Sequence, residues 1–277
     1  MSEPKPYLTI KPKKGWVHLD LYDLWQYRDL LFQLATRDLK LRYKQTALGV
    51  IWVVLQPLMA AGIFSFVFGA VAGLEAPGNA PYFLFSYAGM LGWNLFSGTL
   101  SKVSGCLVGN SQLISKVYFP RLILPLSNIP SVMVDFVVAL VMMFLLMLFY
   151  QVVPHWSLVL LPVWMAALFA LALGIGLTAA SLAVSYRDIN YILPVFLQLL
   201  LYASPIAYAV SSVPEKYRFL FYLNPLSGIL EAFRYAFLGG DPPNPIGLAI
   251  TVLASFLLLF IGLTSFKQME RQFADVV

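Results

Sequence analysis

Six long apolar stretches dominate the sequence and limit what the chain can fold into. They lie near residues 50–72, 82–101, 129–150, 157–184, 191–210 and 246–266. Each reaches the roughly 20 residues that an α-helix needs to cross the hydrocarbon core of a bilayer. Only 11% of the chain is charged, whereas soluble domains carry about a quarter. The pattern predicts an all-α integral membrane protein with six transmembrane helices.

Positive charges are distributed unequally between the two sides of such a bundle. Six crossings place both termini on the same side, and that side carries fifteen of the 18 lysines and arginines. Segments rich in Lys and Arg near the ends of membrane spans are retained in the cytoplasm. We therefore predict cytoplasmic N- and C-termini.

The segment before the first stretch has the pattern of a helix that lies on the membrane surface. Asp20 can cap it, and its apolar residues recur at helical spacing: Leu21, Leu24, Trp25, Leu31, Phe32 and Ala35. A helix with Trp and Arg at the edge of its apolar stripe lies in the headgroup region. We therefore expect a cytoplasmic tail with an interfacial helix in residues 1–48 and a transmembrane domain in residues 49–277.

A basic block, RDLKLRYKQT, separates this helix from the first apolar stretch. On a continuous helix, Arg37, Lys40 and Lys44 project within about 60° of one another, while Arg42 points away. Such a stripe lies at the level of the lipid headgroups. It is consistent with a topological anchor and equally with a contact to an anionic headgroup.

A seventh segment, 217–240, is almost long enough to cross the membrane. It contains Glu231 and Arg234, and each charge costs about 2.5–3.5 kcal/mol at the centre of a span. Asn224-Pro225 also interrupts it. We predict two short helices, at 214–223 and 226–238, that form a re-entrant hairpin on the outer side. An amphipathic pair lying on the outer surface is the alternative.

Motifs for catalysis and metal binding are absent from the sequence. It contains no GxxxxGK[ST], HExxH or GxSxG motif, and its one cysteine, Cys106, excludes a Cys-pair metal site. The chain therefore lacks the P-loop route to ATP hydrolysis, and we predict no catalytic and no metal-binding residues. Asp135 lies inside an apolar stretch, where an acid either pairs with a neighbouring group or has a functional role.

Three further patterns concern packing and surfaces. Small residues recur every four positions at Ala170, Gly174 and Thr178, which predicts close approach of another helix. Asn110 or Ser111 can cap a short helix in the loop 108–128, which should dock against this chain or another subunit. Aromatic side chains belong mostly to lipid-facing and interfacial positions, but their faces also stack on sugar rings. The candidates to line a polymer path are Trp52, Tyr87, Trp93, Phe96, Tyr202 and Tyr208.

Four stretches together carry a resemblance to a known family. They are RDLKLRYKQTALGVIWVVLQPL (37–58), NSQLISKVYFPRLILPLSN (110–128), YRD (186–188) and LNPLSGILEAFRYAFLG (223–239). In this order, the chain resembles the permease subunits of type-2 ABC exporters, specifically those that move O-antigen and related polysaccharides. Teichoic-acid exporters share much of the pattern. The resemblance implies an interfacial N-terminal helix, a coupling helix in the first cytoplasmic loop, and two re-entrant gate helices before the last span.

The resemblance also implies partners. Such permeases are homodimers that work with two copies of a separate ABC ATPase subunit. That subunit would bind ATP and magnesium, so no cofactor is expected on this chain. Membrane lipids and a lipid-linked polysaccharide are the remaining expected partners, and no nucleic acid is expected.

Site residues follow from the same resemblance. The residues expected to couple to the ATPase are Gln112, Lys116, Tyr118 and Arg121 in the first loop, with Trp25 and Arg28 in the interfacial helix. The segment 214–238 would close the outer side, and its expected gate residues are Tyr217, Phe221, Tyr222 and Phe233.

The expected function is therefore that of a transport subunit and not of an enzyme. The exporter would move undecaprenyl-pyrophosphate-linked polysaccharide from the cytoplasm to the periplasm across a bacterial inner membrane. The cations expected to attract the pyrophosphate are Arg37, Lys40, Arg42 and Lys44. Export of teichoic acid or a capsule polysaccharide is one alternative. A stand-alone channel or secondary carrier is another, and a lipid-modifying enzyme is a third.

Overall fold

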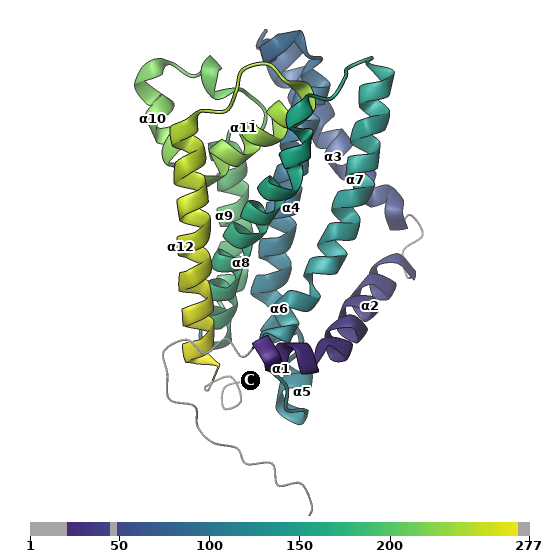
Figure 1. Cartoon of the computed structure of the whole chain (residues 1–277), viewed down its shortest axis with the longest axis vertical. Coiled ribbons are helices and arrows are strands. Elements are labelled where there is room, and N and C mark those ends of the chain that lie inside the picture. Colours follow the sequence, from purple (N-terminus) through teal and green to yellow (C-terminus); the bar gives the residue numbers. More distant parts are fainter. Residues whose placement is uncertain (1–20, 45–48, 271–277) are drawn as a thin grey trace, which may run out of the picture.

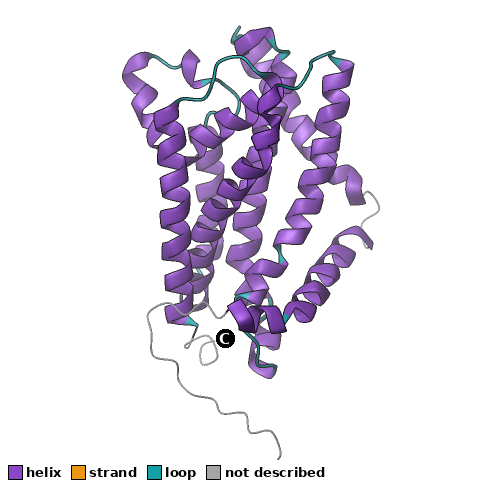
Figure 2. Ribbon diagram, in the orientation of Figure 1, coloured by secondary structure: helices purple, strands orange, loops and turns teal. Residues whose placement is uncertain are grey.

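A computed structural model describes residues 21–44 and 49–270, which form helices joined by short connections (Figure 2). The elements are α1 (Leu21–Gln26), α2 (Arg28–Lys44), α3 (Gly49–Phe64), the π-helix η1 (Ser65–Val71), the 3-10 helix η2 (Pro77–Asn79), α4 (Tyr82–Gly109), α5 (Ser111–Lys116), α6 (Ile123–Ser127), α7 (Ile129–Phe149), the 3-10 helix η3 (Trp156–Leu160), α8 (Leu161–Ser185), α9 (Ile189–Ala203), the 3-10 helix η4 (Val210–Ser212), α10 (Glu215–Leu223), α11 (Pro225–Leu238) and α12 (Pro245–Met269). The predicted all-α class is confirmed for these residues.

Four helical stretches in the described ranges are long and apolar enough to cross a membrane. They are Ile51–Val71, Ile123–Phe149, Trp156–Ser185 and Pro245–Met269. The second predicted stretch forms α4, with 28 residues. The fifth forms α9, which has 15 residues and ends earlier than predicted, at Ala203. Its helix stops where Ser204 adopts an extended backbone before Pro205, because the residue before a proline disfavours the helical conformation.

Helix α4 runs through the centre of the bundle (Figure 1). Its side chains Leu84, Tyr87 and Phe96 are fully buried among residues of α3, α7, α8 and α11. The Tyr87 hydroxyl donates a hydrogen bond to the backbone carbonyl of Ala139 on α7, at 3.0 Å. This contact satisfies a polar group that would otherwise be costly inside the membrane.

The α8–α12 pair is packed backbone against backbone. A side chain on Gly174 of α8 would collide with the backbone of Leu258, and one on Gly262 of α12 would collide with the backbone of Gly174. The Thr178 hydroxyl donates to the Gly174 carbonyl at 3.0 Å, which satisfies a polar group within the same helix. The close approach predicted from the small-residue spacing is therefore confirmed at Gly174.

The predicted interfacial helix is divided into two. It breaks between α1 and α2 at Tyr27, and Asp20, its predicted cap, lies outside the described residues. Leu34 is buried in the bundle, whereas Trp25 and Phe32 are 67% and 64% exposed. The predicted stripe thus packs only in part, and its two largest aromatic side chains face outward.

A second, smaller core lies at the end of the bundle where α1 and α5 are found (Figure 1). It brings together buried residues from six helices and from the loop before α6, including Leu34, Leu107, Ile114, Phe119 and Phe266. Helices α10 and α11 lie at the opposite end of the bundle (Figure 1). Two separate candidate sites result, one at each end.

Candidate functional site

The short helix α5 has one buried and one exposed side. Ile114 is 2% exposed and packs into the smaller core. Gln112 and Lys116 are exposed, and Tyr118, just after the helix, is 77% exposed. The helix predicted in this loop is confirmed, and it docks on its own chain through Ile114. The opposite side remains open to another subunit.

Trp25 of α1 and Arg28 at the start of α2 add an aromatic residue and a cation at the same end. The Arg28 guanidinium lies 5.2 Å from the centre of the Trp25 ring, and it donates to the Trp25 carbonyl at 3.4 Å. Both side chains are exposed. Together with Gln112, Lys116 and Tyr118, they form an accessible surface, which we call the α1–α5 surface.

Arg121 holds the loop after α5 against the end of α12. Its backbone N–H donates to the carboxylate of Glu270 at 3.1 Å, and its guanidinium donates to the Val117 carbonyl at 3.3 Å. Lys267 pairs with the same carboxylate at 2.8 Å. Arg121 therefore positions the loop, and its guanidinium is partly engaged.

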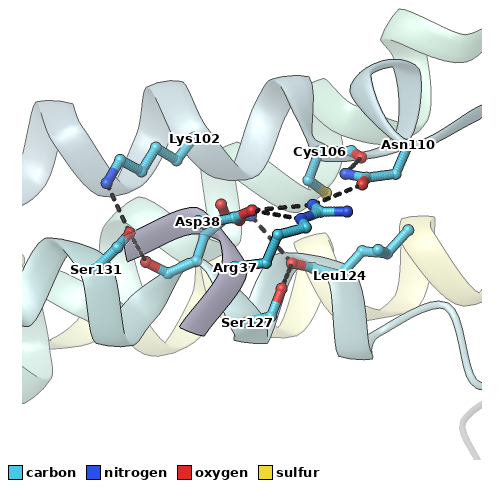
Figure 3. Close-up of polar contacts among 9 residues, drawn as sticks. Arg37, Asp38, Lys102, Cys106, Asn110, Leu124, Ser127 and Ser131 are labelled. Carbon is cyan, nitrogen blue, oxygen red and sulfur yellow. Dashed lines mark hydrogen bonds and ion pairs between the residues drawn. The ribbon is translucent and has the colours of Figure 1, made fainter. Parts of the chain in front are cut away.

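Arg37 connects helix α2 to the junction between α4 and α5 (Figure 3). Its guanidinium donates to the Asn110 side chain at 3.0 Å and pairs with Asp38 at 2.9 Å. The Asn110 amide donates to the Cys106 carbonyl at 2.9 Å. Asn110, one of the two predicted caps, is the N-cap residue of α5, but its side chain makes no cap hydrogen bond there. The Asn110 side chain instead accepts a hydrogen bond from Arg37 and donates one to the backbone of α4.

Of the other three cations of the basic block, only Lys40 has a side chain within the described part of the structure. Lys40 is exposed and lines a shallow groove along α2 with Phe32, Thr36 and Arg37. The side chains of Arg42 and Lys44 lie outside the described residues. Of this block, the described structure therefore presents Lys40 as an accessible cation and Arg37 as an engaged one.

Six aromatic residues were predicted to line a path, and the structure divides them. Tyr87, Trp93 and Phe96 on α4 are at most 6% exposed and belong to the central core. Trp52 and Tyr202 are 51% and 63% exposed. The partly buried Tyr208 donates its hydroxyl to the Tyr202 carbonyl at 3.1 Å. The structure therefore brings together Tyr202 with Tyr208, and Trp93 with Phe96, whose ring centres are 5.9 Å apart in the central core.

The predicted gate residues lie on α10 and α11. Tyr217 is 49% exposed, and Phe221 packs edge-on against Tyr208 with ring centres 5.8 Å apart. Tyr222 is partly buried against α12 at Gly247. Phe233 is fully buried and packs edge-on against Phe136 of α7. Phe233 thus anchors α11, while the other three lie nearer the surface.

Asp135 has a cationic partner on the neighbouring helix. Its carboxylate lies 3.8 Å from the ammonium of Lys102 on α4, and this ammonium donates to the Ser131 hydroxyl at 2.7 Å (Figure 3). The pair borders a cavity of about 190 Å³ between α3, α4 and α7, which Gln56, Asn94 and Ser97 also line. The expectation that Asp135 pairs with a neighbouring group is confirmed, and the partner is a lysine.

Comparison with known proteins places this arrangement in a family. Residues 29–238 match the family described as ABC-2 type transporter. The chain belongs to the ABC-2 type transporter family. It is 28% identical to proteins named O-antigen export system permease protein RfbA from Klebsiella pneumoniae and Myxococcus xanthus, over 92% of this chain and 98% of each relative. It is 25% identical to the polysialic acid transport protein KpsM of Escherichia coli, over 86% of this chain and 92% of that relative.

The burial of one residue of this ABC-2 type transporter was not predicted from the sequence. Arg234 on α11 is 5% exposed, whereas the sequence indicated only that its charge disfavours a seventh crossing. Its guanidinium lies 4.1 Å from the centre of the Phe85 ring, and it donates to the Tyr208 carbonyl at 3.1 Å. The available signal was the pair Glu231 and Arg234, three residues apart on one face of an otherwise apolar helix.

Burial changes the acidity of this pair. It lowers the pKa of the Arg234 guanidinium to about 10, while the Glu231 charge opposes the shift. Burial raises the pKa of the Glu231 carboxyl, whereas a hydrogen bond from the Asn244 backbone and the charge of Arg234 act to lower it. Arg234 therefore stays protonated at neutral pH and places a positive charge at the α10–α11 end of the transporter.

Proposed function

We propose that this chain is the transmembrane subunit of an ATP-driven exporter. Its substrate is an undecaprenyl-pyrophosphate-linked polysaccharide of the O-antigen type, moved from the cytoplasm to the periplasm. The observation that carries the proposal is the match over 92% of the chain to proteins named O-antigen export system permease. The sequence has no P-loop motif, so ATP is hydrolysed by a separate subunit.

The proposed topology has six spans and a re-entrant hairpin. The spans are α3 with η1, α4, α7 with α6, α8, α9 and α12. Helices α10 and α11, with nine and 14 residues, are too short to cross, since a span needs about 20. They dip into the outer leaflet, and α1 and α5 lie at the cytoplasmic end. The excess of Lys and Arg in the segments at the α1–α5 end supports this orientation.

The proposed partner of the α1–α5 surface is the ATPase subunit. Exposed polar and aromatic side chains are typical of surfaces that bind another protein. Gln112, Lys116 and Tyr118 contact the ATPase with Trp25 and Arg28 beside them, and Arg121 positions the loop. Two copies of this chain form the passage, and each binds one ATPase subunit.

The substrate enters at the cytoplasmic end. Lys40, with Arg42 and Lys44, attracts the pyrophosphate, because cations near a membrane surface each contribute about 1 kcal/mol toward anionic groups. The exposed rings of Trp52 and Tyr202 and the partly buried ring of Tyr208 contact the polymer. Helices α10 and α11 close its exit, with Tyr217, Phe221 and Tyr222 nearest the surface.

Deleting the gene in its host tests the proposal. We expect lipid-linked polysaccharide to accumulate inside the cell and the matching polymer to disappear from the surface, both restored by the wild-type gene. Normal surface polymer without internal accumulation would contradict the function. Loss of another surface polysaccharide with intact O-antigen would favour the second candidate, transport of a polymer of the kind named for the Escherichia coli relative, polysialic acid.

Reconstitution separates the exporter from a stand-alone channel or carrier. The purified chain in liposomes should move no polymer until the ATPase subunit and ATP are supplied. Transport by the chain alone would show that the ATPase is not needed.

A further inference from the structure

A half-open cavity of about 330 Å³ lies at the α10–α11 end of the bundle. It is bounded by α10, α11, η4 and the loop that leads into α12. Its volume is at the lower end of the roughly 300–1,000 Å³ that small-molecule sites occupy. Its size suits one small ligand and excludes a length of folded polymer. Its polar lining includes Arg218, Tyr222, Glu231, Arg234, Tyr235 and Asp241.

Two of these side chains have hydrogen-bonding atoms that lack partners. Within the described part of the chain, no partner reaches Nε or Nη2 of Arg234, or one carboxylate oxygen of Glu231, and all three atoms are buried. Buried polar groups in native proteins are almost always paired. Arg234 is 5% exposed and contributes to the lining of this cavity, and its two unused N–H groups lie beside Gly89 of α4. The lining therefore includes a buried charged side chain whose hydrogen-bonding capacity no described residue takes up.

The charges of the lining identify the class of ligand. Arg218 and Arg234 are balanced by Glu231 and Asp241, so neither an anion nor a cation is favoured overall. The lining offers N–H and O–H donors beside carboxylate acceptors. A hydroxyl group both donates and accepts, so a ligand with several adjacent hydroxyls matches this mixture. The rings of Tyr222 and Tyr235 add aromatic surface for the faces of a sugar.

We propose that this cavity binds one neutral sugar residue through its hydroxyl groups. Tyr222, Tyr235 and Asp241 bind the residue at the wall, and Arg234 and Glu231 complete the site beneath it. The source of the sugar is the exported polymer, and this step rests on the function proposed above. A sugar residue held here at the exit resists return of the polysaccharide into the passage.

Saturation-transfer NMR on the purified full-length protein in nanodiscs tests the binding. The probes are D-mannose, D-galactose and N-acetyl-D-glucosamine, with N-acetylneuraminic acid as an anionic sugar. We expect transfer to at least one neutral sugar and less to the acid. Transfer to none of the neutral sugars, or preference for the acid, overturns the assignment.

Two conservative variants locate the binding. Tyr222→Phe and Asp241→Asn each remove one hydrogen-bonding group, so we expect about threefold to tenfold weaker binding in each. The matched controls are Tyr191→Phe and Asp29→Asn, whose side chains are 78% and 82% exposed and line no part of this cavity. Equal affinity in the wild type and both cavity variants would place the sugar elsewhere and overturn the proposal.

Two further measurements separate this proposal from the function on which it rests. Delipidated polysaccharide from the host should compete with the neutral sugar, and failure to compete overturns the polymer as the source. If the wild-type gene restores surface polysaccharide but no sugar binds, the cavity assignment alone fails. If sugar binds but deletion leaves surface polysaccharide normal, the exporter function fails.

Discussion

The two ends of the bundle hold their arginines in opposite ways. At the α1–α5 end, Arg28 and Arg37 are 49% and 46% exposed and pair with acids next to them in sequence. At the α10–α11 end, Arg234 is 5% exposed and is enclosed by an aromatic ring and a carbonyl. Exposed ion pairs contribute about 0–1 kcal/mol, whereas changes at buried charges cost several. The arginines at the α1–α5 end can therefore change their ion-pair partners at little cost in free energy, whereas Arg234 is fixed by the packing around it.

Backbone packing is also tighter at the α10–α11 end than at the α1–α5 end. At the α10–α11 end, a side chain on Gly228 would lie 2.6 Å from the backbone of Gly247, so α11 rests directly on α12. At the other end, a side chain added to Gly105 of α4 would meet no atom of another segment within 4 Å. The glycines thus offer a matched pair of substitutions that tests how rigid each end is.

The largest expected effect is an opposite response to alanine at these two glycines. Gly228→Ala should lower the free energy of unfolding by about 1–3 kcal/mol, because it overpacks a backbone contact. Gly105→Ala should raise it by up to about 1 kcal/mol, because alanine is the better helix former. Thermal unfolding of both purified variants in detergent measures the difference. Equal responses would remove the contrast between the ends.

The next effect concerns binding at the α1–α5 surface. Tyr118→Ala should weaken the affinity for the ATPase subunit about thirtyfold, since truncating an aromatic residue central to an interface costs about 2 kcal/mol. Its own unfolding should change by less than about 0.5 kcal/mol, because the side chain is 77% exposed. Affinity is measured with the purified ATPase subunit.

The control for this variant is Phe219→Ala on α10. Phe219 is an aromatic residue at the opposite end, with 65% exposure, and its loss should leave ATPase affinity unchanged. If the two variants behave alike, the α1–α5 surface is not where the ATPase binds.

Local chemistry made part of the fold predictable. Asn224-Pro225 separates α10 from α11 as expected, because the Asn224 side chain accepts the Leu226 N–H at 3.0 Å and begins the second helix. Phe119-Pro120 likewise follows the end of α5. The spacing that includes Gly174 predicted close packing, since a helix face with small residues admits another backbone.

Contacts between distant segments were not predictable from one sequence. Arg37 and Asn110 are 73 residues apart, and no local pattern signals their bond. The burial of Tyr87 and Trp93 was also missed, because an aromatic residue in a membrane helix is equally apolar whether it faces lipid or a neighbouring helix. The contacts that bury Arg234 were not predictable for the related reason that Phe85 and Tyr208, which enclose it, lie on other segments.

A smaller effect separates the two described cations of the basic block. Lys40→Gln should weaken the binding of undecaprenyl pyrophosphate about fivefold, since a cation at the membrane surface contributes about 1 kcal/mol. Arg37→Gln should weaken it by less, because its guanidinium already serves Asp38 and Asn110. Binding is measured with protein in nanodiscs. The reverse order would show that Arg37 leaves its partners for the lipid.

Replacing all four cations tests the block as a whole. Glutamine at Arg37, Lys40, Arg42 and Lys44 should reduce both pyrophosphate binding and export. If both stay intact while the protein still inserts, the block serves as a topological anchor and has no role in substrate capture.

The smallest expected effect tests whether the α1–α5 end is as adaptable as its exposed charges indicate. Arg28→Lys keeps the charge but loses the planar group that lies over Trp25 at 5.2 Å. Because cation–π contacts at exposed sites contribute about 0.5–1 kcal/mol, the free energy of unfolding should fall by less than about 1 kcal/mol. Chemical denaturation of the purified variant measures the change. A loss as large as that of Gly228→Ala would mean that this end is held by fixed packing too, and an ATPase could then bind only to a surface that is already rigid.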